Sequence, residues 1–153
     1  MSKREEFNAA LKTAMRSKDQ VSLSTLRLIT AAVKDRDIEA RSKGKDDGIT
    51  ESEILSLLQS MVKQRQESSK TYKDAGREEL AQREEQEIEV IERFLPKQMD
   101  SSEAGKTIES LISEMGVSDI RDMGKVMAEL KSRYAGQIDM GKASGMVKEK
   151  LAG

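Results

Sequence analysis

Apolar residues recur along most of the chain at intervals of three and four residues, the period of a helix that buries one face. Long runs of Val, Ile, Thr and Tyr, which are typical of strands, are absent. The pattern therefore predicts an all-α fold class. The predicted helices cover residues 2–18, 20–41, 50–75, 77–95, 100–116, 122–136 and 139–153.

Three apolar side chains extend the buried stripes of the N-terminal helices. Met15 continues the four-residue spacing of Phe7 and Leu11. Ile38 widens the apolar row of the second helix, and Leu80 begins that of the fourth. We therefore expect all three side chains to lie in the core.

Polar residues mark several helix ends. Ser2, Thr50 and Asp100 each stand three residues before a glutamate, the spacing at which a side chain caps a helix N-terminus. Gly76 and Gly116 follow apolar stripes and can adopt the left-handed conformation that ends a helix. These residues predict the ends of three helices.

Pro96 is the only proline and follows the fourth predicted helix. Proline disfavours helix in the residue before it and cannot continue one without losing a hydrogen bond. We expect an N-terminal four-helix part, a bundle or hairpin of residues 1–95. A proline hinge would join it to a small three-helix part of residues 96–153.

The last third of the chain contains a fifteen-residue phrase twice, at 122–136 and 139–153. Seven positions match at an offset of seventeen residues. Each copy begins with Asp-Met-Gly-Lys, so Asp122 and Asp139 are predicted N-caps. The matched pairs are 122/139, 123/140, 124/141, 125/142, 131/148, 135/152 and 136/153.

Each copy places a lysine in the first turn of a helix, where the helix dipole, free N–H groups and the ammonium all favour an anion. Further cations follow in both copies. A phosphate-binding patch is one interpretation; the other is that each aspartate makes its lysine part of a simple helix cap. The candidate residues are Gly124, Lys125, Lys131, Arg133, Gly141, Lys142 and Lys148, with Arg121 beside them.

The residues available for catalysis are few. The chain has no Cys and no His, which excludes thiolate metal sites, Cys nucleophiles and every catalytic arrangement based on histidine. Five glutamates at 84, 85, 87, 89 and 92 are dense enough for a metal, but carboxylate-bridged metal sites in helical bundles pair Glu with His. We expect no metal, no cofactor and no enzymatic activity of this chain alone.

Charge is nearly balanced, with 27 Lys and Arg against 28 Asp and Glu. Residues 1–77 carry a net +4, 78–95 −5, 100–119 −4 and 120–153 +3. This variation is also what ordinary solvated helix faces produce. No apolar run reaches the 18 residues of a membrane span, so we expect no membrane association and a cytoplasmic location.

Two other stretches carry clustered cations. The loop at 42–48 contains two lysines and two glycines, but it lacks the spacing of a phosphate-binding P-loop and reads as an exposed loop. The helix that follows surrounds a tyrosine with five cations, and this face would meet phosphate or an acidic partner; alternatively, the tyrosine is core and the cations its rim. The candidate residues are Lys63, Arg65, Lys70, Tyr72, Lys73 and Arg77.

Several short phrases occur in a fixed order along the chain. They are Lys63-Gln64-Arg65, Ala75-Gly76-Arg77, Glu87-Ile88, Leu95-Pro96-Lys97-Gln98 and Asp122-Met123-Gly124-Lys125-Val126-Met127. This ordered set resembles the YqeY family, whose members are free-standing relatives of the C-terminal tail of the GatB subunit of glutamyl-tRNA(Gln)/aspartyl-tRNA(Asn) amidotransferase. The resemblance covers almost the whole chain.

The resemblance implies an all-helical fold and contact with tRNA through the small C-terminal part, at helix starts like Gly124-Lys125 and Gly141-Lys142. It implies no catalytic part, so a family label of glutamine-dependent carbon–nitrogen ligase would come from the larger amidotransferase. The first functional expectation is a tRNA-binding or accessory module. The second is a protein-interaction module that docks on an amidotransferase or another translation component.

Overall fold

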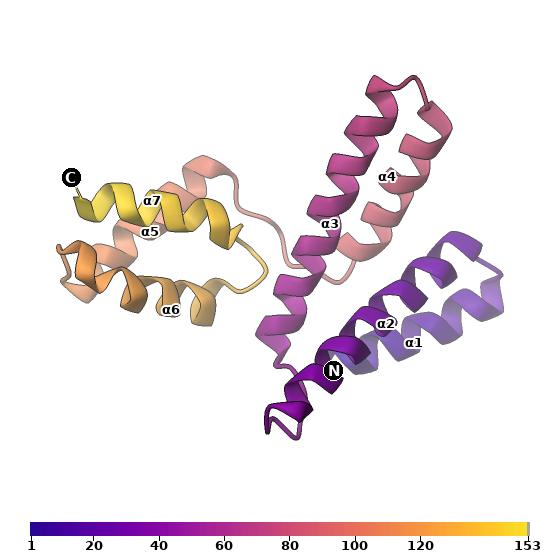
Figure 1. Cartoon of the computed structure of the whole chain (residues 1–153), viewed down its shortest axis with the longest axis horizontal. Coiled ribbons are helices and arrows are strands. Elements are labelled where there is room, and N and C mark those ends of the chain that lie inside the picture. The colour runs from indigo at the N-terminus through magenta and orange to yellow at the C-terminus, as the bar shows by residue number, and fades with distance from the viewer. Residues whose placement is uncertain (153) are drawn as a thin grey trace. The chain divides into compact units, whose positions relative to one another are not determined.

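The computed structural model describes residues 1–152, which form seven α-helices, one short 3-10 helix and no strand (Figure 1). The predicted all-α class is confirmed, and every predicted helix overlaps an observed one. The helices are α1 (Lys3–Ser17), α2 (Gln20–Ser42), α3 (Glu51–Asp74), α4 (Glu78–Glu92), α5 (Ser101–Met115), η1 (Ile120–Asp122), α6 (Met123–Tyr134) and α7 (Met140–Ala152).

The predicted capping residues begin their helices as expected. Ser2, Thr50 and Asp100 each accept a hydrogen bond from the backbone N–H three residues later, at 3.2, 3.1 and 2.8 Å. At Thr50 the carboxylate of Glu53 accepts a bond from the Thr50 N–H at 3.3 Å, which completes a capping box. Gly116 ends α5 with a φ of 67°. These ends depend on neighbours within four residues, which is why the sequence reveals them.

The chain divides into two compact units, one formed by Met1–Leu95 and one that begins at Pro96. In the first unit, α1 and α2 form one antiparallel pair and α3 and α4 another (Figure 1). Phe7 and Phe94 pack edge to face, with ring centroids 5.0 Å apart. The other large buried side chains are Leu23, Leu26, Ile29, Val33, Ile49, Ile54, Leu57, Leu58, Met61, Val62, Val90 and Ile91.

The three apolar side chains that extend the predicted stripes are not buried. Met15 is 58% exposed, Ile38 54% and Leu80 42%, so their prediction as core residues is wrong. In each case the residue next to it in the sequence is buried instead. Adjacent residues lie about 100° apart around the helix axis, so the buried side of each helix differs from the predicted side by about that angle. Small or polar residues occupy these buried positions, so large apolar spacing does not mark them. The neighbours are Ala14, Asp37 and Ala81.

The outer half of the α3–α4 hairpin, residues 64–83, extends past the apolar core. Among these residues only Ser69 and Ala81 are buried. Polar contacts hold the two helices together here, which explains how a hairpin with so little apolar contact stays paired. The contacts are Arg65–Glu87 at 3.3 Å, Lys73–Glu85 at 2.5 Å and Ser69–Glu85 at 3.3 Å.

The second unit packs α5, α6 and α7 around an aliphatic core (Figure 1). The segment before α5 is tied to the turn before α7, because the Met99 N–H donates to the Gln137 carbonyl at 2.9 Å and the Gln98 amide donates to the Gly136 carbonyl. The buried residues are Ala104, Ile108, Leu111, Val126, Leu130, Ile138, Ala143, Val147 and Leu151.

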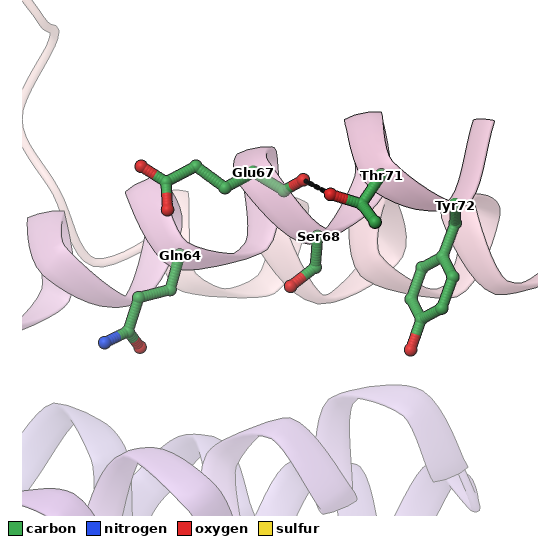
Figure 2. Close-up of a pocket in the computed structure, with 5 residues that line it drawn as sticks. All are labelled: Gln64, Glu67, Ser68, Thr71 and Tyr72. Atoms are coloured by element: carbon green, nitrogen blue, oxygen red, sulfur yellow. Dashed lines mark hydrogen bonds between the residues drawn. The ribbon is translucent and has the colours of Figure 1, made fainter. Parts of the chain in front are cut away.

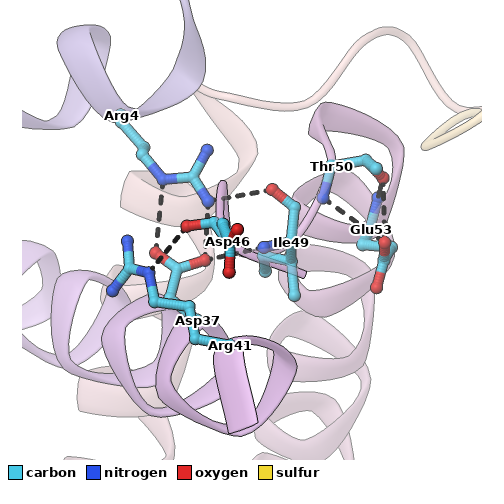
Figure 3. Close-up of polar contacts among 7 residues, drawn as sticks. All are labelled: Arg4, Asp37, Arg41, Asp46, Ile49, Thr50 and Glu53. Carbon is cyan, nitrogen blue, oxygen red and sulfur yellow. Dashed lines mark hydrogen bonds and ion pairs between the residues drawn. The ribbon is translucent and has the colours of Figure 1, made fainter. Parts of the chain in front are cut away.

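One buried carboxylate joins three segments of the first unit (Figure 3). Asp37 of α2 is 6% exposed and receives both Arg4 Nη2 at 2.6 Å and Arg4 Nε at 3.3 Å. The Ile49 N–H donates to the same carboxylate at 2.8 Å, and Arg4 donates to the Ile49 carbonyl at 2.9 Å. Burial by itself would raise the pKa of Asp37, but the hydrogen bonds from Arg4 and Ile49 hold it below its ordinary value.

Asp37→Asn is expected to lower the free energy of unfolding at pH 7 by about 2 kcal/mol. The neutral amide loses the ion pair with the Arg4 guanidinium, and the loss is limited because Arg4 is partly exposed to solvent. The pKa is lower in the folded state, so this stability is present above the unfolded pKa of about 4 and is lost as the pH falls through the folded pKa. Urea unfolding at pH 7 and pH 3 measures it, and the difference between wild type and variant should be smaller at pH 3 than at pH 7.

Asp35→Asn is the control, because Asp35 is exposed and lies two residues away on the same helix. Its effect should stay within about 0.5 kcal/mol. Equal losses for Asp35→Asn and Asp37→Asn would show that the Asp37 network does not stabilise the unit.

Gly48→Ala is expected to destabilise the protein more than Gly44→Ala. Both glycines have positive φ, 79° and 88°, so each alanine carries a backbone penalty of about 1 kcal/mol. Only at Gly48 would the new Cβ also meet Asp37, whose Oδ1 would be 2.3 Å away; around Gly44 nothing lies within 4 Å. Thermal unfolding measures the difference, and equal melting temperatures would contradict the steric explanation.

Candidate nucleic-acid interface

The duplicated phrases form α6 and α7, which bury equivalent faces. Val126 and Leu130 are fully buried in α6, as are Ala143 and Val147 in α7. At the offset of seventeen residues, Val126 corresponds to Ala143 and Leu130 to Val147. The repeat is therefore a repeat of helices with the same core-facing register.

The exposed faces of the two helices also match. Gly124, Ala128 and Lys131, spaced four and three residues apart along α6, are exposed. Their equivalents at the same offset, Gly141, Gly145 and Lys148, are exposed in α7. A Cβ added at Gly124 or Gly145 would meet nothing within 4 Å. Each helix thus presents a lysine beside small side chains that leave its surface open.

The two helices begin differently. Asp139 accepts the Gly141 N–H at 2.9 Å and the Lys142 N–H at 3.3 Å, so its predicted capping role is confirmed. Asp122 also occupies the N-cap position of α6, as predicted, but its side chain makes no capping hydrogen bond. The chain reaches α6 through the 3-10 turn η1, which Asp119 caps, and this turn changes the approach of the backbone to α6.

The predicted cations divide into paired and unpaired side chains. Arg133 contacts Glu114 and Glu129, each at 3.0 Å, and the Glu114 carboxylate raises the pKa of Arg133. Lys125 lies 3.8 Å from Asp122. Arg121 pairs with Asp119 at 3.2 Å. The first-turn lysine of α6 is thus already beside a carboxylate.

Lys131, Lys142 and Lys148 make no ion pair or hydrogen bond through their side chains to any residue in 1–152. All three are exposed. We call these three residues the lysine set. In α7 the Asp139 carboxylate already occupies the N-terminal N–H groups, so an anion would meet the lysine ammonium groups and not the helix end.

The five candidate cations, four on α3 and Arg77 at the start of α4, do not surround Tyr72 as one face. Arg65 and Lys73 turn towards α4, where the Glu85 carboxylate raises the pKa of Lys73. Lys63 is not free either. Lys70 and Arg77 are exposed and unpaired within the described chain.

Tyr72 lies on another flank of α3, in line with Gln64 and Ser68 (Figure 2). With Glu67 and Thr71 these residues line an open hollow of about 370 Å³. Figure 2 shows Gln64, Ser68 and Tyr72 pointing to the same side. The hollow carries amide and hydroxyl groups and one carboxylate, so it differs in chemistry from the cationic face that the sequence suggested.

Three of the five glutamates in the α4 cluster contact cations or lie partly buried, whereas Glu89 and Glu92 are exposed. Glu85 and Glu87 contact Lys73 and Arg65, and burial together with Glu87 raises the pKa of Glu84. Within residues 1–152, no group of three or more His, Cys, Asp or Glu is arranged to hold a metal ion.

The loop at 42–48 directs its N–H groups to backbone carbonyls. Gly44, Lys45 and Gly48 donate to Arg41, Ala40 and Lys45. These three N–H groups are bonded to the end of α2 and to the loop itself, so they do not form a cradle for phosphate. Among the described helices, none combines the length and apolarity needed to cross a membrane.

The fold and the site define a small protein of two helical units, the second of which carries a duplicated helix with an exposed lysine. Comparison with known proteins identifies it further. A family model described as Yqey-like protein matches residues 4–151, so the chain belongs to the YqeY family.

Curated relatives are fungal proteins named "Altered inheritance of mitochondria protein 41, mitochondrial". The protein of Pyrenophora tritici-repentis is 31% identical over 83% of this chain and 70% of its own length. That of Vanderwaltozyma polyspora is 28% identical over 74% and 62%. That of Meyerozyma guilliermondii is 30% identical over 91% and 63%. The chain thus spans between 62% and 70% of these three relatives.

These relatives correct the expected cytoplasmic location, because each carries the word mitochondrial in its name. The expectation depended on the absence of an apolar membrane segment. Such a segment reports on membrane insertion and does not distinguish one aqueous compartment from another.

Asp139→Ala is expected to destabilise α7 by about 1 kcal/mol, because the Gly141 and Lys142 N–H groups lose their acceptor. Asp122→Ala removes the residue at the equivalent position of α6, which makes no capping bond, and should cost less than about 0.5 kcal/mol. Hydrogen exchange of the α6 and α7 amides measures both. Equal protection losses would contradict the assigned difference between the two helix starts.

Proposed function

We propose that this protein binds tRNA through its C-terminal unit and acts as an accessory protein of translation. The observation that carries the proposal is the exposed face repeated in α6 and α7, with small side chains and an unpaired lysine at the same position of each helix. Lys142 adds a third unpaired ammonium.

Phosphate contact is the chemistry that this face supports. A lysine ammonium group donates hydrogen bonds and accepts none, so it suits phosphate oxygens. When such groups neutralise phosphates, the counterions held by the RNA are released, which favours binding. Gly124, Ala128, Gly141 and Gly145 keep the surface between the lysines low, so an RNA backbone can approach closely. Such contacts hold RNA without reading its sequence.

The resemblance to the tail of the amidotransferase GatB subunit supports tRNA as the RNA. The proposal includes no catalytic role for the chain alone, since it contains neither histidine nor cysteine. Purified protein should release no ammonia from glutamine. Ammonia release above a no-protein blank would contradict this part of the proposal.

Replacing the lysine set by glutamine, Lys131→Gln with Lys142→Gln and Lys148→Gln, should weaken tRNA binding. The slope of log K against log salt should become shallower by about 2–3 units, because each lost phosphate contact removes about 0.7–0.9. Filter binding of unfractionated tRNA between about 25 and about 200 mM KCl, a range over which salt increasingly screens charge, measures the slope.

The matched control removes the same charge from elsewhere in the unit, by Lys97→Gln, Lys106→Gln and Lys150→Gln. Lys150 is held by Glu109 at 3.3 Å, and Lys106 lies on α5. This variant should retain most of the slope. Equal losses in the two variants, or no tRNA retention at low salt, would reject the proposed site.

The second candidate function is a docking module that uses the α3 hollow. The hollow offers Gln64, Ser68 and Tyr72 as hydrogen-bonding groups on an exposed flank. Tyr72→Ala should then remove a protein partner from pull-downs that survive nuclease treatment. If nuclease removes every captured protein, the captured complexes depend on RNA and the docking function is rejected.

A further inference from the structure

In the α1–α2 hairpin more of the positive than of the negative side chains are left without a partner. Residues 1–45 contain eleven Lys and Arg and six Asp and Glu. Four of the six carboxylates are used inside the unit as ion-pair partners or caps. They are Glu6 with Lys3, Asp19 with Ser22, Asp37 with Arg4 and Ile49, and Glu39 with Lys43.

A smaller share of the cations is used, four of the eleven against four of the six carboxylates. Lys3, Arg4 and Lys43 pair with these carboxylates, and Arg41 donates to the Asp46 carbonyl at 3.2 Å. The other seven have no ion pair or side-chain hydrogen bond within the part of the chain that the structure describes. They are Lys12, Arg16, Lys18, Arg27, Lys34, Arg36 and Lys45.

Three of these cations meet on the outer side of the hairpin. The Arg4–Asp37 pair marks the line along which α1 and α2 touch. At about 100° per residue, Lys12 lies about 80° around α1 from Arg4 and Lys34 about 60° around α2 from Asp37, both away from the core. Arg27 is two helical turns before Lys34 on the same face of α2.

The antiparallel arrangement brings the two helices into register. The turn between α1 and α2 contains only Lys18 and Asp19, so Arg27 lies level with Ala10. Lys12 is then about 3 Å from Arg27 along the helix axes. Lys12, Arg27 and Lys34, which we call the basic face, thus lie on one exposed side of the hairpin, which they share with Glu5, seven residues before Lys12 on α1.

We propose that the basic face binds RNA phosphates and gives the N-terminal unit an RNA contact of its own. The choice of RNA as the polyanion rests on the proposed function; the face itself rests on the unpaired cations. Lysine and arginine supply donors only, which suits the acceptor oxygens of a phosphate backbone.

The test compares two triple variants of the same hairpin. Lys12→Gln, Arg27→Gln and Lys34→Gln remove the basic face. Arg36→Gln, Lys43→Gln and Lys45→Gln remove equal charge at residues that line a separate small cavity beside Ile49 and Glu53. All six positions are exposed and glutamine is a good helix former, so circular dichroism melting should show both variants folded.

Filter binding of unfractionated tRNA across the same salt series gives the expected result. The basic-face variant should flatten the slope of log K against log salt by about 2–3 units, and the matched variant by less than about 1. Equal changes would show that only overall charge matters and would overturn the inference. Binding of poly-glutamate to the basic face, with no effect of the variant on tRNA, would assign the face to an acidic protein and also overturn it.

The outcomes separate this inference from the proposed function. If loss of the lysine set weakens tRNA binding while loss of the basic face behaves like its control, the proposed function stands and the inference fails. If only loss of the basic face weakens binding, the inference stands and the proposed C-terminal site fails. No tRNA retention by wild type at low salt would overturn both.

Discussion

The buried carboxylate of Asp37 holds together the segments on which the N-terminal unit depends. It joins the first turn of α1, the last third of α2 and the loop that leads into α3, through Arg4 and the Ile49 N–H. The core of this unit contains one aromatic pair and is otherwise aliphatic. Aliphatic contacts are not directional, so they do little to fix how the helices are positioned. A charge-assisted, bidentate bond supplies the missing geometric specificity. The approach of Gly48 to Asp37 is a consequence of the same bond.

Carboxylates elsewhere in the chain are used in the same way. Some cap helices, as Asp100, Asp119 and Asp139 do. Others pair with cations across two helices, as Glu85 does with Lys73 and Glu114 with Arg133. A nearly neutral chain therefore leaves some exposed cations, such as Lys131 and Lys148, without a carboxylate partner among the described residues. Net charge alone conceals this division.

The duplicated helices show how a sequence repeat and its use can separate. Both copies keep the same buried register and the same exposed lysine position, but only Asp139 caps its helix. The first-turn lysine of α6 lies near Asp122, whereas Lys131 and Lys148 remain unpaired. The proposed phosphate contacts therefore combine one helix start, at Lys142 of α7, with Lys131 and Lys148 in later turns. Membership of the YqeY family is consistent with this arrangement and does not by itself assign a role to any lysine.

The sequence by itself determined the helices, their capping residues and the family, because helix formation and capping depend on residues no more than four apart. It misplaced Met15 and Ile38, since a rotation of one residue decides which side of a helix is buried. Only the tertiary structure decided which charges are free. The partners Arg4 and Asp37 are 33 residues apart, and Arg133 and Glu114 are 19 apart. Such pairs form only when packed helices bring distant segments together, which local patterns do not encode.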